Sequence, residues 1–429
     1  MKCPALSTPE RTLPAFLPWI IWGLGAILFG YTFFQRVAPG VMVDTLMREF
    51  TVGGAVLGNL SAVYFYTYAL SQVPAGLVVD AYGSRRLLMA SAAFLTLGSI
   101  IFASATSIPV AFVGRLLIGL GGGATFVIAL NLASVWLPPS RFAMLSGMTL
   151  SFGVLGSLAG QVPLAWGVDA FGWRTSLYVS TLVAVAICIA TVFILRVPRP
   201  VVKHTLVPNM AGNFKSVMGR RETWILTAGS VGTMSIMLTF GGLWAVPWLT
   251  QVYGFTRPEA AMVISVNALG WGIGSPLLAW ISKWVGNRKG PFVVATFCSV
   301  LFYGLLVTVP DLPRPAIYTL LFFQGLGNGA IVLIFTMAHE QFAGGQEGAS
   351  VGVINTGTMA GAAVLQPLVG LLLDINWHGA EADGARIYDA EAYQIGLSVL
   401  IASGALAPLA GLFMTKKNVR PGLGAGGGH

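Results

Sequence analysis

Long apolar runs, separated by short polar segments, occupy almost the whole chain. A transmembrane helix needs about 20 mainly apolar residues, and twelve stretches of 19 to 28 residues meet this requirement. We predict these spans at 16–43, 56–79, 87–105, 110–136, 144–168, 177–195, 224–249, 260–281, 291–309, 316–338, 349–373 and 395–414. Strands of a membrane barrel would instead alternate over about ten residues. The pattern therefore predicts an all-α integral membrane protein with twelve transmembrane helices.

Composition and the placement of charge support this interpretation. Of the 429 residues, 55% are hydrophobic and 9% are charged, whereas soluble domains have roughly 25% charged residues. The net charge of +9 does not indicate a nucleic-acid partner, because 17 Lys and Arg lie in segments on one side of the predicted spans and five on the other. The positive-inside rule then places both termini in the cytoplasm, as expected for a multi-pass protein of a bacterial inner membrane.

The longest connection on the basic side divides the spans into two groups of six. We predict an N-terminal six-helix bundle at 1–195, a cytoplasmic linker at 196–222, a C-terminal six-helix bundle at 223–415 and a disordered glycine-rich tail at 416–429. The three cysteines show no paired spacing, so neither a disulfide framework nor a metal site is expected. No cofactor is expected either, and both bundles in one chain favour a functional monomer.

The two halves repeat one another at an offset of 203 to 206 residues. The run Gly-Leu-Gly-Gly-Gly-Ala at 119–124 recurs as Gly-Leu-Gly-Asn-Gly-Ala at 325–330. Internal repeats of this kind build many secondary carriers, with the substrate site near the midplane where the halves meet. Further matched positions are Gly147 with Gly352, Gln161 with Gln366, Asp169 with Asp374, and the loop 83–86 with 286–289.

The loop after the second predicted span carries a recognisable motif. It reads Gly-Leu-Val-Val-Asp-Ala-Tyr-Gly-Ser-Arg-Arg at 76–86, and the fourth span contains Arg-Leu-Leu-Ile-Gly at 115–119. The whole chain thereby resembles the major facilitator superfamily, whose members are twelve-helix transporters that work by alternating access. The resemblance implies a conformational brace at the inner end of the second span, formed by Gly76, Asp80, Gly83, Arg85 and Arg86. The alternative is that these are ordinary charges of an inner loop. The Gly-Pro antiporter signature of the family is missing from the fifth span.

Two basic residues, Arg36 and Arg115, lie inside predicted spans. Ionisable groups at membrane depth are costly and mark functional sites by default. Arg36 is eight positions before Asp44, about 12 Å from the end of its helix, and both arginines fall in the outer half of the first bundle. A guanidinium suits carboxylate or phosphate, so an anionic substrate is expected. The alternative is that each arginine satisfies backbone carbonyls.

The 15 acidic residues all lie in loops or at helix ends, which argues against proton coupling through a mid-membrane carboxylate and against a naked metal ion as substrate. The resemblance implies that the first, fourth, seventh and tenth spans line the cavity. Further candidate substrate-binding residues on these spans are Tyr31, Trp244, Gln324 and Asn328.

A second resemblance concerns two short stretches. The opening seven residues and the segment around Arg36 are similar to magnetosome-membrane carriers of magnetotactic bacteria, a group implied to move iron. If this holds, iron would travel as an anionic chelate and the location would be a magnetosome membrane derived from the inner membrane.

The expected function is secondary transport of a small organic anion or anionic chelate, on a site built from Arg36 and Arg115. The rival from another class is a receptor or assembly protein that uses a carrier scaffold without transporting. An enzyme is not expected, because no nucleophile and base are placed together and no nucleotide motif occurs.

Overall fold

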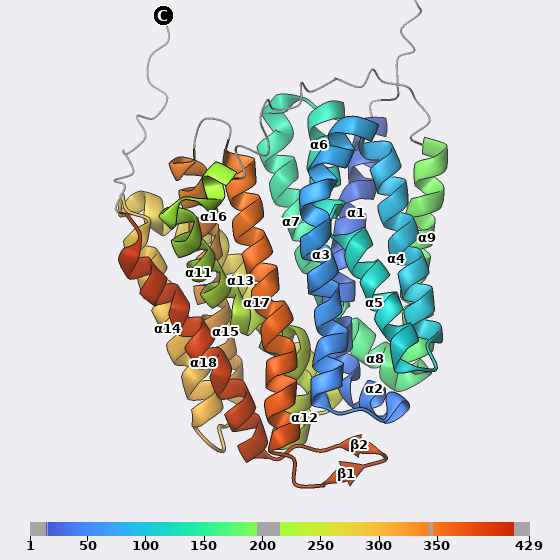
Figure 1. Ribbon diagram of the computed structural model, residues 1–429, viewed down its shortest axis with the longest axis vertical. Coiled ribbons are helices and arrows are strands. Elements are labelled where there is room, and N and C mark those ends of the chain that lie inside the picture. The colour runs from blue at the N-terminus through green and yellow to red at the C-terminus, as the bar shows by residue number, and fades with distance from the viewer. Residues whose placement is uncertain (1–13, 15, 195–214, 343–345, 416–429) are drawn as a thin grey trace, which may run out of the picture.

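A computed structural model describes residues 14, 16–194, 215–342 and 346–415. The predicted linker 196–222 lies mostly outside these residues, and the opening stretch and the tail 416–429 lie wholly outside them. The described helices form two groups that stand side by side (Figure 1). We call the face at which α1 begins the terminal face, and the opposite face, which carries strands β1 and β2, the hairpin face.

The first group contains the spans that the sequence predicts for the first half. Its elements are α1 (Leu17–Val37), η1 (Ala38–Met42), α2 (Val43–Phe50), α3 (Gly54–Tyr82), α4 (Ser84–Ser104), α5 (Ile108–Gly122), α6 (Thr125–Trp136), η2 (Pro139–Arg141), α7 (Phe142–Ala159), α8 (Val162–Phe171) and α9 (Trp173–Ile194).

The second group repeats this plan. Its elements are α11 (Arg221–Ile236), η3 (Met237–Trp244), α12 (Ala245–Tyr253), α13 (Arg257–Trp284), α14 (Lys289–Thr308), α15 (Arg314–Asn328), α16 (Ile331–Gln341), α17 (Glu347–Ile375), β1 (Glu381–Ala382), β2 (Ala385–Arg386) and α18 (Ala390–Phe413). The two short strands pair as an antiparallel hairpin.

The all-α membrane architecture is confirmed. Within the described ranges, eleven helical segments are long and apolar enough to cross a bilayer. The remaining predicted span, 56–79, falls on α3, a continuous helix of 29 residues. The first span is longer than predicted, because helical structure continues through η1 and α2 to Phe50.

The four spans expected to line a cavity are not regular helices. The first changes to a 3-10 segment at Ala38–Met42, and the seventh contains the π-helical segment η3. The fourth breaks between Gly122 and Thr125, and the tenth breaks at the repeat-related place between Asn328 and Ile331. Matched interruptions in the two halves of a carrier are a pointer to its binding site.

Glycine allows the backbones of neighbouring helices to touch within the first bundle. A Cβ atom added to Gly156 of α7 would lie 1.9 Å from the carbonyl oxygen of Gly30 in α1. The same residue type brings α5 against α3, where a Cβ at Gly119 would lie 2.5 Å from the carbonyl oxygen of Tyr64. These glycines therefore act as close-packing surfaces, which positions α1, α3 and α5 around a common core.

The two bundles are joined at the hairpin face. Asp374 at the end of α17 binds the start of α3, and Arg257 at the start of α13 binds Asp169 at the end of α8. Between these two contacts, a Cβ on Gly40 of η1 would lie 2.8 Å from the carbonyl oxygen of Gly242 in η3. The bundles approach each other at this end and separate toward the terminal face (Figure 1).

Candidate functional site

Arg36 lies buried near the end of α1, among aromatic rings. Its side chain is 6% exposed, and its guanidinium carbon lies 4.1 Å from the ring centre of Phe33 and 5.1 Å from that of Tyr68. Such cation–π contacts stabilise a cation by about 0.5 to 2 kcal/mol, which is small beside the cost of removing it from water. The Nε atom has no hydrogen-bond partner. Arg36 is therefore a buried cation whose charge is incompletely satisfied.

Arg115 lies in α5 and is fully buried. Its Nη1 donates a hydrogen bond of 2.8 Å to the carbonyl oxygen of Gln35, and its Nη2 donates one of 3.4 Å to the carbonyl oxygen of Ser61. These contacts tie α5 to α1 and α3, which is the backbone-satisfying role that the sequence left open for this residue. Its Nε also lacks a partner.

The two arginines converge on one tyrosine. The ring centre of Tyr64 in α3 lies 5.6 Å from the guanidinium carbon of Arg36 and 5.3 Å from that of Arg115. The sequence pattern did not single out Tyr64, because Tyr64, Tyr66 and Tyr68 alternate along one helix and cannot all face one way. Tyr66 instead crosses to the second bundle and donates to the carbonyl oxygen of Ala363.

No carboxylate of the described residues forms an ion pair with either arginine. Across the described residues the structure contains seven ion pairs, and neither Arg36 nor Arg115 takes part in them. Two positive charges on one aromatic ring in an apolar bundle form a region of positive potential. An anion that reaches this region would replace part of the lost hydration.

The remaining predicted site residues occupy different places. The hydroxyl of Tyr31 bonds to Ser99 at 3.0 Å and accepts a bond of 2.6 Å from Nε2 of Gln35. Its ring also lines an apolar groove of about 620 Å³ between α1, α7, α8 and α9. Trp244 is fully buried in η3, where its Nε1 donates to the carbonyl oxygen of Gln366.

Gln324 and Asn328 belong to a polar cluster within the second bundle. Asn267 of α13 donates to Oε1 of Gln324, and Ser299 of α14 donates to Oδ1 of Asn328 at 2.8 Å. Nδ2 of Asn328 has no partner. This cluster ties α15 to α13 and α14, so these two residues contribute to the core of the bundle.

The residues of the predicted brace are described only in part. Gly76 and Asp80 lie in α3, but the side chain of Asp80 is outside the described part of the structure. Gly83 ends α3 with φ of +79°, a conformation that favours glycine. Arg85 and Arg86 are exposed, and Arg85 lies 3.5 Å from the carbonyl oxygen of Val192 in its own bundle. The brace therefore stays a prediction.

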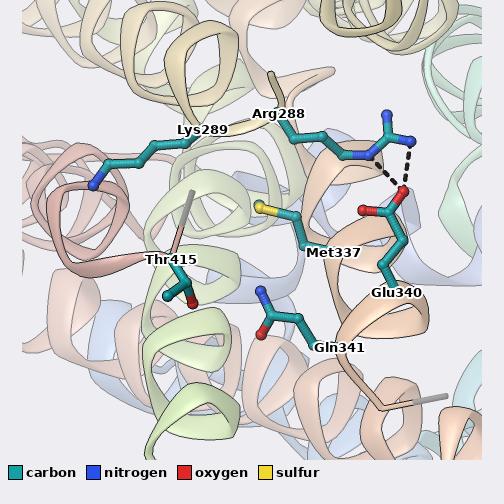
Figure 2. Close-up of a pocket in the computed structure, with 6 residues that line it drawn as sticks. All are labelled: Arg288, Lys289, Met337, Glu340, Gln341 and Thr415. Carbon is teal, nitrogen blue, oxygen red and sulfur yellow. Dashed lines mark hydrogen bonds and ion pairs between the residues drawn. The ribbon is translucent and has the colours of Figure 1, made fainter. Parts of the chain in front are cut away.

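The corresponding loop of the second half holds its own bundle together (Figure 2). Arg288 forms an ion pair with Glu340 at the end of α16, with two nitrogens on one carboxylate oxygen. Lys289 donates to the carbonyl oxygens of Leu412 and Met414 at the end of α18.

Comparison with known proteins is decisive for the family. The sequence profile of the Major Facilitator Superfamily matches residues 24–367. The chain belongs to this superfamily. It is therefore a membrane transporter of the secondary type and not an enzyme, in agreement with the motifs at 76–86 and 115–119.

Named relatives share limited identity over most of their length. The gentisate transporter of Corynebacterium glutamicum is 26% identical over 82% of each chain. The probable sulfoacetate transporter of Cupriavidus necator is 22% identical over 67% of this chain and 69% of its own.

Solved structures confirm the superfamily fold. A bacterial homolog of the human lysosomal transporter Spinster, inward-facing and unoccupied, superposes with a TM-score of 0.76 at 14% identity and covers 94% of this chain and 97% of its own. The D-xylose–proton symporter gives a TM-score of 0.72 at 16% identity, covering 93% of this chain and 96% of its own.

Proposed function

We propose that this superfamily member transports a small organic anion, bound at Arg36 and drawn in by the combined charge of Arg36 and Arg115. The observation that carries the proposal is the convergence of two buried guanidiniums on Tyr64 without a carboxylate partner. A substrate anion supplies the missing counter-charge through charge-assisted hydrogen bonds. The unpaired Nε of Arg36 is a donor already available for this purpose.

Two relatives named above are described as transporters of organic anions, gentisate and sulfoacetate. This supports an organic acid as the substrate class. The relatives named above give no support to iron or to a magnetosome membrane, so we do not include the iron chelate in the proposal. We further propose a bacterial inner membrane with both termini in the cytoplasm, and a functional monomer, because one chain supplies both bundles.

Proteoliposomes test the proposal directly. Purified protein should take up or exchange labelled benzoate, sulfoacetate or a related organic anion, and Arg36→Gln should reduce that flux at least tenfold. Arg141→Gln is the matched control, because Arg141 is an exposed arginine at the start of α7. Equal transport by Arg36→Gln and the parent protein would contradict the proposal. Binding without flux would instead favour the receptor alternative.

A further inference from the structure

Two repeat-related glutamines meet the same short segment of the seventh span. Gln366 of α17 is fully buried, and its Nε2 donates a hydrogen bond of 2.9 Å to the carbonyl oxygen of Leu238. Gln161, at the junction between α7 and α8, is 5% exposed, and its Nε2 lies 3.5 Å from the carbonyl oxygen of Gly241. Both carbonyls belong to the π-helical segment η3.

The side-chain oxygens of both glutamines have no partner. Oε1 of Gln161 and Oε1 of Gln366 are buried without a hydrogen bond, and so is Oγ1 of Thr239 within η3. A buried polar atom that loses its hydration without a replacement bond costs about 1 to 3 kcal/mol. Because each Nε2 already points at a main-chain carbonyl, each Oε1 is held as an oriented acceptor. π-helical segments are frequent at functional sites.

These acceptors lie on the hairpin side of Arg36. A Cβ on Gly160, next to Gln161, would lie 2.9 Å from the carbonyl oxygen of Phe34 and 2.7 Å from Val37. One turn further along the first span, a Cβ on Gly40 would lie 2.8 Å from the carbonyl oxygen of Gly242 in η3. Gly40 follows Arg36 by four residues along this span. Gln161 therefore follows a residue that packs against the first span within one turn of Arg36, and Gln366 contacts the same segment η3.

We propose that Gln161 and Gln366 recognise hydrogen-bond donors on the substrate, so that the transported organic anion carries a hydroxyl group in addition to its acidic group. Arg36 binds the acidic end, and the two glutamine oxygens accept bonds from the hydroxyl end. This inference rests on the proposed function and adds to it a specificity rule. A neutral acceptor pair next to fixed positive charge suits a donor group of the anion better than it suits a metal cation, which Arg36 and Arg115 would repel.

A site built to bond a hydroxyl rejects the analogue that lacks it, because its polar atoms are then left unpaired. The test uses purified full-length protein and matched pairs of anions: 3-hydroxybenzoate with benzoate, malate with succinate, and lactate with propionate. Affinity is measured by thermal stabilisation and by competition for uptake. At least one hydroxylated acid should bind about tenfold or more tightly than its partner without the hydroxyl.

Variants assign this preference to the glutamines. Gln161→Met and Gln366→Met keep the volume and remove both polar atoms, so each should reduce the ratio of the affinities for the hydroxylated acid and its partner, and the double variant should bring that ratio close to one. Gln161→Glu, protonated at acidic pH, offers a donor and an acceptor again and should retain the preference. Gln72→Met is the matched control, because Gln72 also bridges the bundles but its Oε1 already accepts a bond of 2.8 Å from Asn355.

The outcomes separate this inference from the function on which it rests. Wild-type protein that binds both members of every pair equally overturns the inference while the anion carrier stands, and this result needs no variant to fold. A preference that survives both methionine variants, or that is lost equally in Gln72→Met, also overturns it. If none of these acids binds, or if Arg36→Gln binds them unchanged, the proposed function itself fails and the inference falls with it.

Discussion

Asp374 of the second bundle caps the N-terminus of α3, the helix of the first bundle that begins at Gly54. Its Oδ1 accepts a hydrogen bond of 2.8 Å from the backbone N–H of Gly54, and its Oδ2 accepts one of 2.9 Å from Ala55. Tyr388 and Arg386 donate to the same carboxylate. The first amides of a helix lack partners within it, and a negative charge there is stabilised by the helix dipole. The contact therefore joins the bundles at the hairpin face.

Removing this carboxylate should open the hairpin face. In a protein whose three native cysteines are replaced by serine, Thr239→Cys places a thiol at a fully buried position of η3. Adding Asp374→Ala should speed its labelling by an impermeant maleimide about tenfold or more, because hydrogen bonds to a charged group are each worth about 1.5 to 3 kcal/mol. Asp311→Asn, at an exposed loop position on the same face, is the control. If Asp374→Ala leaves the labelling rate of the thiol at position 239 unchanged, the Asp374 contact does not keep the hairpin face closed.

Asp169 is the repeat-related counterpart of Asp374, and it should contribute less. It pairs with Arg257, and the side chains are 43% and 21% exposed respectively. Exposed ion pairs are worth about 0 to 1 kcal/mol. A double-mutant cycle with Asp169→Asn and Arg257→Gln, read by the same labelling assay, should therefore give a change of fivefold or less. A coupling as large as the Asp374 effect would contradict this ranking, because the Asp169 and Asp374 contacts would then stabilise the closed hairpin face equally.

Substitution of Arg115 should lower the stability of the ligand-free protein, whereas substitution of Arg36 should weaken anion binding. Arg115→Gln removes two bonds to backbone carbonyls, so it should lower the melting temperature of the ligand-free protein. Arg36→Gln removes a buried charge without an ion-pair partner, so it should leave that temperature unchanged or raise it. The same Arg36 variant should lose stabilisation by organic anions. The reverse ranking of the two ligand-free melting temperatures would contradict these roles.

Gly156 and Gly147 of α7 provide a matched pair for helix packing. A Cβ at Gly156 meets the main chain of Gly30, whereas a Cβ at Gly147 has no atom within 4 Å. Gly156→Ala should therefore destabilise the protein by about 1 to 3 kcal/mol. Gly147→Ala should be neutral or stabilising by up to about 1 kcal/mol, because alanine favours helix. Thermal unfolding of both variants in one detergent measures the difference.

The all-α membrane fold was predictable from sequence because membrane spans are long and uniformly apolar. The helix interruptions were not predicted. The breaks after Gly122 and Asn328 lie within the repeated glycine run, but glycine in a membrane helix is also typical of close helix packing, so the run alone does not predict a break. The 3-10 segment η1 and the π-helical segment η3 contact each other across the bundles, and a contact of this kind leaves no local pattern in the sequence.

The candidate site was predictable only in part. Intramembrane charge pointed to Arg36 and Arg115, and the structure brings both to Tyr64. Tyr31, Trp244, Gln324 and Asn328 stay predictions as substrate-binding residues, because they were inferred from the helix on which they lie, and helix identity does not say which face a residue occupies. Gln161 and Gln366 carried a signal as matched repeat positions. Their importance emerged only when the structure placed both against η3.

Arg36 and Arg115 belong to one bundle, so their charges keep their places relative to each other as the two bundles rock. When such a carrier binds an anion, no carboxylate of its own moves in to neutralise the two arginines. Each monovalent anion that crosses without a companion ion therefore moves one elementary charge through the membrane potential. A potential of 100 mV is worth about 2.3 kcal/mol for that charge, or about fiftyfold in concentration. For the proposed anion in the proposed bacterial inner membrane, the inside-negative voltage therefore favours export over import, unless a second ion travels with the anion.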